Sequence, residues 1–550
     1  MGMSVQSATT PDYRATAIKL APVVVPSIVF LLHAALFTSW IVDDAGISFA
    51  YARNLATGHG LVSQPGLPPV EGYSNPLWVF LTALLYRLHL FAIPATPKLV
   101  SWFLVLISFA ILGKLAARPW AVAVALMMLA LNTSFVVWTT SGLENPLYVL
   151  LLCLLAYWSR EFVTATQFRP WRAARLGLLA TAIAMTRPEG ALYLATFPTI
   201  LLVSRVYRRR RGTAPLPRAL LVYGTVFAVC FGAFLWFRWS YFGDLMPNTY
   251  YAKGSAFLPP RIHIFEPPLP LPPLSPRLLD VVYGAGGWAG VLAAAWTVLA
   301  TGYLLRGRRF GVAGAVVGLM MAFALSDYLL LPQDWMEEYR FATPFYTFFM
   351  LYAVLVTADF LDALRREEKT RISVAIALAV LALVGSGFVF AGRSAKFARE
   401  PTVDFDEVRE GTSQRFDWYA RALGVQSGSV LVPDLGATLW YSQLRIYDLG
   451  MLCDRTIART LNRDEAAFHD YLFGVAKPTF LHTHGQWAYF AALDQDPRFR
   501  RDYTPIWEHV EPWRPKGWRG RIPMSGDYVR KEAVRGREET LEQLRQHSWW

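Results

Sequence analysis

Long apolar segments constrain the fold of this 550-residue chain more than any other feature. An α-helix needs about 17–25 predominantly apolar residues to cross the hydrocarbon core of a bilayer. Segments of this length are residues 18–42, 97–115, 120–137, 142–158, 219–239, 285–305, 311–331, 341–364 and 372–391, and two shorter ones, 176–185 and 191–204, flank the sequence TRPEG. Because 54% of all residues are hydrophobic, the pattern predicts a polytopic α-helical membrane protein.

Basic residues gather in every second connection between these segments. Short loops rich in Lys and Arg face the cytoplasm in membrane proteins. Membrane topology therefore explains the net charge of +13 and disfavours nucleic-acid binding. The basic connections contain Lys114 and Arg118; Arg160, Arg169, Arg172 and Arg175; Arg205, Arg208, Arg209, Arg210, Arg211 and Arg218; Arg306, Arg308 and Arg309; and Arg365, Arg366, Lys369 and Arg371.

The same alternation limits how the first loop connects to the rest. If the basic N-terminal end is cytoplasmic, the first segment carries Asp43 to the outer face, and only one crossing can separate Asp43 from Lys114. Residues 75–91 are apolar enough to cross, so we expect them to lie along the outer interface instead. The first segment is too long for a signal-peptide core and is expected to remain as an anchor. The result is about 11 crossings, with the N-terminus inside and the C-terminus outside.

The composition becomes polar after residue 391. Residues 429–449 have the pattern of strand, turn, helix and strand, and residues 477–484 that of another strand. A stretch of this length can bury one core. We therefore expect a membrane domain over residues 1–391 and a small extracytoplasmic α/β domain over residues 392–550.

Two adjacent aspartates, Asp43 and Asp44, follow the first apolar segment. A carboxylate beside the membrane can accept a proton from a hydroxyl, and low-dielectric surroundings raise its pKa toward a useful range. The pair could also hold a divalent metal ion. The alternative is that both are solvated residues that mark the end of a helix.

Other polar residues lie in connections predicted on the same outer face. Glu144 begins a crossing and could act as a helix cap, while Arg187 and Glu189 of the TRPEG turn could form an internal ion pair. Together these clusters indicate a shared cavity, in which arginines bind a phosphate and aromatic rings stack on a sugar. The candidate substrate-binding residues are Glu71, Tyr73, Glu144, Arg187, Glu189, Asp244, Asn248, Tyr250, Lys253, Asp334 and Arg340. Transporters typically place charges at the membrane midplane, so charges at the outer edge favour an enzyme.

Three further motifs are weaker. His482 and His484 are metal-binding residue types without a second pair of ligands, which favours ordinary histidines at a strand edge. The sequence PDLGA at residues 433–437 lacks the full glycine fingerprint of a dinucleotide site. The prolines of residues 257–277 favour an extended loop over a helix.

The sequences DDAGISFAYARNLATGHGLV, VEGYSNPLW, SGLENPLY, TRPEG, YFGDLMPNTYYAK and DWMEEYRF together resemble the GT-C class of polyprenyl-phosphate-dependent glycosyltransferases. Within that class they are most similar to the group of terminal arabinofuranosyltransferases and pilin arabinosyltransferases. The resemblance covers about residues 20–350. It implies a polyprenyl-phosphoryl sugar donor, an active site on the outer face, and a catalytic base at the first-loop aspartates, with Asp44 ahead of Asp43.

We therefore expect a glycosyltransferase of the bacterial cytoplasmic membrane. The resemblance implies that it transfers arabinofuranose to a hydroxyl of a cell-envelope glycan, a lipid-linked saccharide or a surface protein. A divalent metal at Asp43 and Asp44 is the one cofactor considered. A single base predicts inversion at the anomeric carbon, whereas retention would require a second nucleophile, for which Glu144 and Asp244 are available. A lipid-linked saccharide transporter or flippase and a non-catalytic envelope assembly subunit remain as alternatives.

Overall fold

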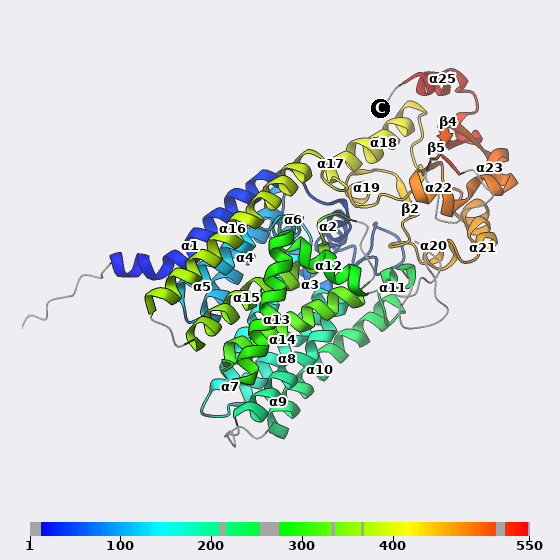
Figure 1. The fold of residues 1–550 in the computed structure, drawn as a ribbon. Helices are drawn as coiled ribbons and strands as arrows, with labels where there is room; N and C mark the ends of the chain where they lie inside the picture. Colours follow the sequence, from blue (N-terminus) through cyan, green and yellow to red (C-terminus); the bar gives the residue numbers. More distant parts are fainter. Residues whose placement is uncertain are drawn as a thin grey trace, which may run out of the picture.

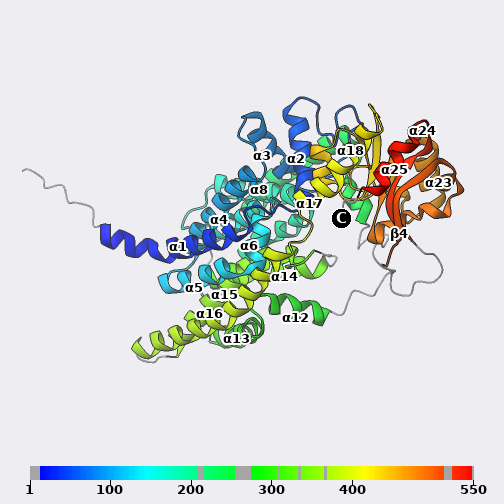
Figure 2. The same ribbon diagram turned by 90° about the horizontal axis from the view of Figure 1, so that it is seen from above.

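The computed structural model describes residues 13–208, 216–253, 274–307, 309–331, 336–364, 368–512 and 523–547. They form a helical body and a C-terminal domain built on one β-sheet, and Figure 1 shows the domain at one end of the body. Figure 2, seen from above, shows the start of α1 at the opposite end. The expected fold class, a polytopic helical membrane protein with a small α/β domain, is confirmed.

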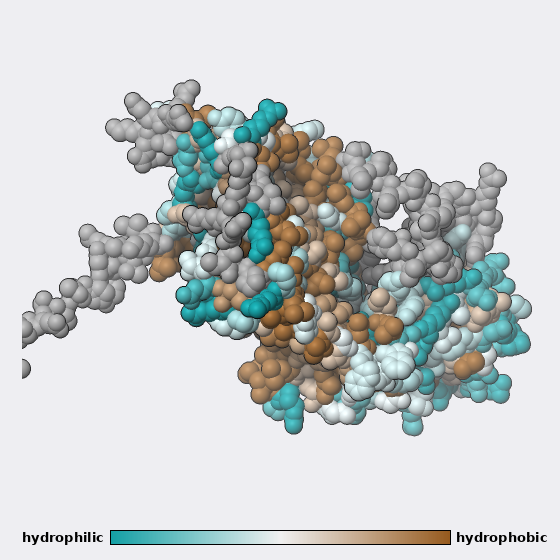
Figure 3. Space-filling model, turned by 90° about the horizontal axis from the view of Figure 1, so that it is seen from below, coloured by the Kyte–Doolittle hydropathy of each residue, from teal (hydrophilic) through white to brown (hydrophobic). Residues whose placement is uncertain are grey.

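The helical body consists of α-helices joined by short connections and three 3₁₀ segments. Its elements are α1 (Tyr13–Ala34), η1 (Ala35–Phe37), α2 (Asp43–Ala56), α3 (Pro76–Arg87), α4 (Ala95–Leu115), α5 (Pro119–Leu131), α6 (Thr133–Thr140), α7 (Asn145–Thr164), α8 (Pro170–Thr186), η2 (Pro188–Ala195), α9 (Thr196–Arg208), α10 (Leu216–Phe242), α11 (Asn248–Lys253), α12 (Leu274–Gly284), α13 (Trp288–Arg306), α14 (Val312–Leu330), η3 (Arg340–Ala342), α15 (Thr343–Ala363) and α16 (Glu368–Arg399). Figure 3 shows hydrophobic side chains over much of this body and hydrophilic ones over the domain.

Eight helices in the described part of the chain are long and apolar enough to cross a membrane, or nine if a bent pair is one span. The bent pair is α5 and α6, which meet at 68°, so the crossing expected over residues 120–137 falls on two helices with a break between them rather than on one straight helix. The break has a local cause, because the side chain of Asn132 accepts a hydrogen bond of 2.8 Å from the backbone N–H of Phe135 and caps α6.

The remaining two of the eleven expected crossings are α8, with 17 residues, and α9, with 13. Polar contacts show that α8 runs from one end of the body to the other. Arg175 near its start pairs with Glu161 at 2.9 Å, whereas Arg187 just after its end pairs with Glu144 at 2.7 Å. The membrane crossing of α8 and α9 stays a prediction.

The basic connections that contain Lys114, Arg118, Arg160 and Arg309 meet at one end of the body, which we call the basic end. Arg118 pairs with Asp359 at 2.9 Å, and Arg160 donates to the carbonyl of Lys114 at 2.7 Å. The guanidinium of Arg309 likewise donates to the carbonyl of Ala363 at 2.7 Å. These contacts bring the ends of α4, α7 and α15 and the connection between α13 and α14 together, as the alternation of charge predicts.

The opposite end, where α2 meets the C-terminal domain, is the domain end. Lys98 at the start of α4 donates to the carbonyls of Phe37 and Thr140, at 2.7 and 2.6 Å. Helix α3 also lies here, packed against α2 and α8. With 12 residues and a rise of 1.5 Å per residue it is about 18 Å long, too short for a hydrocarbon core of about 30 Å.

The C-terminal domain has a five-stranded sheet with the order β2-β1-β3-β5-β4. Strand β1 pairs in parallel with β2 and β3, while β5 pairs antiparallel with β3 and β4. The first three strands lie where the sequence predicts them. The strands are β1 (Ser429–Val432), β2 (Arg445–Asp448), β3 (Phe480–Thr483), β4 (Tyr503–Val510) and β5 (Met524–Arg530).

Short helices cover the sheet of the domain. They are α17 (Phe405–Val408), η4 (Arg409–Gln414), α18 (Arg415–Ala422), α19 (Gly436–Tyr441), α20 (Arg455–Thr460), α21 (Glu465–His469), η5 (Asp470–Ala476), α22 (Gly485–Ala491), η6 (Leu493–Gln495), α23 (Pro497–Asp502), α24 (Lys531–Val534) and α25 (Glu538–Gln546). The expected domain boundary after residue 391 falls inside α16, which continues to Arg399. Of the proline-rich residues 257–277, those before Leu274 lie outside the described part, and α12 begins at Leu274.

Helices α2 and α19 join the two parts of the molecule through two facing glycines (Figure 1). A Cβ atom on Gly46 would lie 2.5 Å from the carbonyl carbon of Gly436, and a Cβ on Gly436 would overlap the backbone carbonyl of Asp43. Only a residue without a side chain lets these backbones approach so closely. The loop before α2 adds a β-bridge between Val42 and Asp404.

We predict that Gly436→Ala lowers the melting temperature of the detergent-purified protein. A methyl group at this contact has no space, and forced overpacking costs about 1–3 kcal/mol. The matched control is Gly411→Ala, because a Cβ at Gly411 meets nothing within 4 Å. Equal melting temperatures for both variants would show that the contact between α2 and α19 does not hold the domain in place.

Candidate active site

The two first-loop aspartates point to different surroundings. Asp43 is buried, and its two carboxylate oxygens accept the backbone N–H groups of Gly436 and Ala437, at 2.8 and 2.7 Å. The side chain of Asp44 is 36% exposed and pairs with Arg340 at 3.2 Å. Asp43 therefore joins the helical body to the C-terminal domain, whereas the side chain of Asp44 is partly accessible to solvent.

Burial raises the pKa of Asp43 to about 8, and the hydrogen bonds from Ala437 and Gly436 act in the opposite direction. Its side chain is buried, and each of its oxygens accepts a backbone N–H group. This position favours a structural role for Asp43, and catalysis by Asp43 and metal binding by the pair stay predictions.

Glu144, Arg187 and Glu189 form one buried network at the domain end. Glu144 accepts hydrogen bonds of 2.7 Å from both Arg187 and Asn75. Arg187 also pairs with Glu189. Asn75 in turn accepts a bond of 3.1 Å from the hydroxyl of Ser48, on the second turn of α2. The network ties the first loop to the TRPEG turn.

Phe341 connects this network to the pair of Asp44 and Arg340. The guanidinium groups of Arg187 and Arg340 lie 4.9 and 4.8 Å from the centre of its ring. A cation over an aromatic face is attracted by the ring quadrupole. The structure thus brings together five of the predicted residues, namely Asp44, Glu144, Arg187, Glu189 and Arg340.

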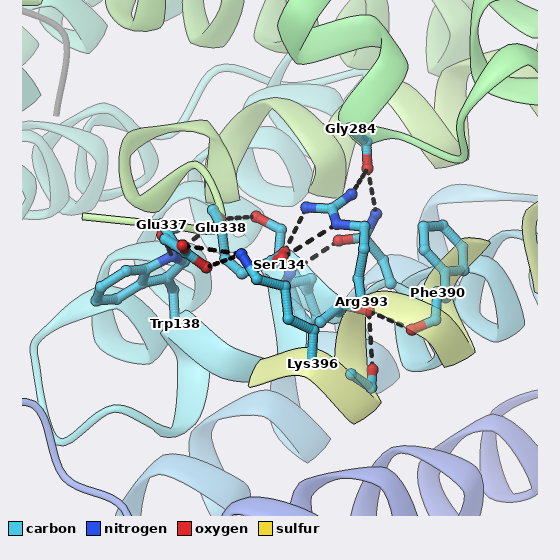
Figure 4. Close-up of polar contacts among 12 residues, drawn as sticks. Ser134, Trp138, Gly284, Glu337, Glu338, Phe390, Arg393 and Lys396 are labelled. Atoms are coloured by element: carbon cyan, nitrogen blue, oxygen red, sulfur yellow. Dashed lines mark hydrogen bonds and ion pairs between the residues drawn. The ribbon is translucent and has the colours of Figure 1, made fainter. Parts of the chain in front are cut away.

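A pocket of about 310 Å³ lies beside Arg340. Its wall includes Arg393 of α16, which donates to Glu338 and, at 3.0 Å, to the carbonyl of Gly284. Figure 4 shows this arrangement, with Lys396 one turn further along α16 and bonded to Glu337 at 3.0 Å. Two arginines, Arg340 and Arg393, and three carboxylates, those of Asp280, Glu337 and Glu338, therefore line one cavity at the domain end.

Two of the other predicted substrate residues, Asp244 and Asn248, hold the helical body against the C-terminal domain. Asp244 pairs with Arg455 at 3.1 Å and with Arg459 at 2.9 Å. Asn248 donates to the carbonyls of Met451 and Leu452, at 3.0 and 2.8 Å.

Glu71 and the predicted tyrosines lie in the same region. Glu71 pairs with Arg238 at 2.7 Å. The rings of Tyr73 and Tyr51 lie 4.8 Å apart, and Tyr250 stacks edge-on with Tyr251. Within the described part of the chain, none of the ion pairs and ring contacts given above joins these residues to Asp44, and their role in substrate binding stays a prediction.

Two predicted residues cannot be placed in the site. Asp334 lies outside the described residues. The backbone of Lys253 ends α11, and its side chain lies outside the described part.

Sequence reasoning missed several residues that support the site. Asn75 lies between the first loop and α3, where the sequence YSNPLW marks the start of a helix at Pro76. Asp327 is buried in α14 and interacts electrostatically with Glu189 and Arg187. An acidic residue inside an apolar segment was the available signal, because such residues mark functional or paired sites.

No protein-family model matches the chain, and no curated protein matches its sequence. Among solved structures, ArnT from Cupriavidus metallidurans in the apo state is 12% identical, with a TM-score of 0.56 over 94% of this chain and 98% of that chain. The archaeal oligosaccharyltransferase AglB from Archaeoglobus fulgidus, solved with an inhibitory peptide and a dolichol-phosphate, is 11% identical. Its TM-score is 0.51 over 92% of this chain and 74% of that chain. These likenesses show that the chain has a GT-C-like fold.

The different surroundings of the two aspartates predict different effects on stability. Asp43→Asn places an amide N–H₂ against a backbone N–H, and a buried donor without a partner costs about 1–3 kcal/mol. We expect a lower melting temperature for Asp43→Asn and an almost unchanged one for Asp44→Asn, both measured by thermal unfolding in detergent. A larger loss for Asp44→Asn would contradict this assignment.

Proposed function

We propose that this chain is a membrane glycosyltransferase that transfers a sugar from a polyprenyl-phosphate carrier to an acceptor hydroxyl. The observation that carries the proposal is one accessible carboxylate, Asp44, paired with Arg340 next to a pocket at the domain end. Here a lipid carrier in the membrane meets an acceptor held in water.

In the proposed reaction the acceptor hydroxyl oxygen attacks the anomeric carbon of the donor sugar. The bond from that carbon to the phosphate oxygen breaks, and polyprenyl phosphate leaves with the electron pair. Asp44 accepts the hydroxyl proton, as a general base within hydrogen-bond reach of the attacking oxygen. Arg340 stabilises the negative charge on the leaving phosphate, and Arg393 lines the same pocket.

Arg340 has a double role in this scheme. Without substrate it is paired with Asp44, and a phosphate bound at its guanidinium would compete for that pair and release the carboxylate. The ring of Phe341 and the carbonyl contact with Asn145 hold Arg340 from the other side. Binding of the donor would thereby prepare the base.

Two further carboxylates of the buried network are bound by partners. Glu144 is held by Asn75 and Arg187, and Glu189 by Arg187. We therefore propose that neither acts as a second nucleophile, and a single displacement at Asp44 inverts the anomeric configuration. Arg187 acts as a positioning residue, because it reaches the site through Glu144 and Phe341.

The comparisons support a lipid-phosphate donor, since AglB is a glycosyl-transferring protein of the same fold solved with a dolichol-phosphate. The finer assignment, arabinofuranose transferred to a cell-envelope glycan, lipid-linked saccharide or surface protein, rests on the sequence motifs. The charge pattern supports an orientation with the basic end in the cytoplasm. The domain end and residues 400–550 then lie outside a bacterial cytoplasmic membrane.

Transfer by purified protein in nanodiscs tests the proposal. The donors are radiolabelled polyprenyl-phosphoryl sugars, arabinofuranose included, and the acceptor is an envelope glycan extract. We expect transfer by wild type and a loss of about 10²–10⁴-fold in Asp44→Asn, the usual contribution of general base catalysis. The matched control is Glu407→Gln, which removes an exposed carboxylate of α17.

Transfer that is equal in Asp44→Asn and wild type would reject Asp44 as the base. Movement of a lipid-linked saccharide across the membrane of sealed vesicles that contain the protein, without a new glycosidic bond, would identify a transporter. Neither activity in folded protein with a competent acceptor would favour an assembly subunit.

Replacement of Arg340 tests the leaving-group role separately. Arg340→Gln removes the charge that faces the phosphate, and loss of one such donor costs about 10²–10³-fold in kcat. Arg340→Lys keeps the charge but not the fork of donors, so part of the rate should return. Equal activity of Arg340→Gln and wild type, at matched expression and melting temperature, would place the phosphate elsewhere.

A further inference from the structure

The sheet of the C-terminal domain has a topological switch point. The chain passes from β1 to β2 on one side, then crosses to β3 on the other side of β1. In open α/β sheets, ligands bind outside the carboxyl ends of the strands at such a point. The carboxyl ends of β1 and β3 lie side by side, because the two strands pair in parallel.

Three residues with metal-binding side chains meet at this edge. Asp434 follows β1 by two residues, His482 lies within β3, and His484 follows β3 directly. One ligand atom from each lies within 4.8 Å of the other two. Among the described residues, no other group of three or more potential metal ligands has its ligand atoms this close together. Asp434 is the partner that the histidine motif lacks in the sequence.

A buried carboxylate orients the first histidine. Nδ1 of His482 donates to Asp527 at 2.7 Å, so its Nε2 carries the free lone pair. Histidines that bind metals typically donate the other ring nitrogen to a carboxylate in this way. Asp527 is itself fixed by Arg415 at 3.1 Å and by the hydroxyl of Tyr419 at 3.0 Å.

The local charge suits a divalent cation. Three carboxylates, those of Asp434, Asp527 and Glu511, surround the two histidines. The guanidinium of Arg415 carries one positive charge and interacts with Asp434, Asp527 and His484. Glu511 accepts the backbone N–H of Gly485, next to His484, at 2.7 Å. The excess of two negative charges matches the charge of one divalent ion.

An ion could reach the cluster from solvent. The side chains of His484 and Asp434 are 43% and 25% exposed, and they are 2.7 Å apart through a hydrogen bond from Nε2 of His484. A metal would replace the proton in this contact, since ligating imidazole is neutral.

We infer that Asp434, His482 and His484 bind one divalent transition-metal ion. Two imidazoles and a carboxylate are the donors that Zn²⁺ and related ions prefer, and three protein ligands leave a position open.

This site would be close to the joint between the two parts of the molecule. Asp434 lies two residues before Gly436, whose N–H holds Asp43. A bound ion would fix the loop between β1 and α19 and, through it, the backbone donors to Asp43. The inference rests on the C-terminal domain and does not depend on the proposed transfer reaction.

The test uses the full chain without a polyhistidine tag, stripped with a chelator and then titrated with Co²⁺ or Zn²⁺. We expect one ion per chain, visible as Co²⁺ absorption bands of a nitrogen and oxygen site and as Zn²⁺ retained after gel filtration. His484→Gln and Asp434→Asn should weaken metal binding at least about tenfold. Even loss of a residue that only hydrogen-bonds to a metal ligand typically lowers metal affinity by about 10- to 100-fold. His509→Gln, an exposed histidine of β4, should bind as wild type does.

A second readout covers variants with impaired folding. Zn²⁺ should raise the melting temperature of wild type and of His509→Gln, since a ligand that binds the folded state stabilises it. The same ion should leave the melting temperature of His484→Gln unchanged. Absence of stoichiometric binding by folded wild type, or equal binding by His484→Gln, would overturn the inference and leave a hydrogen-bonded cluster.

Discussion

The hydrogen bonds from Gly436 and Ala437 to Asp43 are the interaction on which the rest of the molecule depends. They join a carboxylate of the helical body to the backbone of the C-terminal domain, in a contact that two facing glycines make close enough. A buried carboxylate costs much free energy unless donors satisfy it. The pairing therefore fixes the first loop and the domain in one relative position, and the ion pairs of Asp244 with Arg455 and Arg459 reinforce it.

The same contact decides which aspartate can react. Side chains of neighbouring residues in a helix point about 100° apart. Because Asp43 is buried against α19, Asp44 points away from this contact, toward Arg340. Arg340, Phe341 and Arg187 then link Asp44 to a rigid set of buried charges. A base held by packed elements and left accessible at its tip is the arrangement that general base catalysis needs.

Apolar periodicity and alternating charge could predict the membrane fold, because both are local properties of the chain. The alternation of charge alone also predicted that residues 75–91 do not cross the membrane, which agrees with the short length of α3. The break at Asn132 could not be predicted in this way, because a hydropathy profile does not detect a helix cap inside an apolar segment. The distinction between Asp43 and Asp44, and the meeting of Asp434 with His482 and His484, depend on residues hundreds or tens of positions apart. The periodic patterns of a single sequence do not reveal such long-range contacts.

The most direct test of the active-site assignment is a cryo-electron microscopy map of the protein in nanodiscs with bound polyprenyl phosphate. We expect phosphate density within hydrogen-bond distance of the Arg340 guanidinium, in the pocket shared with Arg393, and Asp44 separated from Arg340. Phosphate density at the basic end, beside Arg118 and Arg309, with the pair of Asp44 and Arg340 intact, would contradict the assignment.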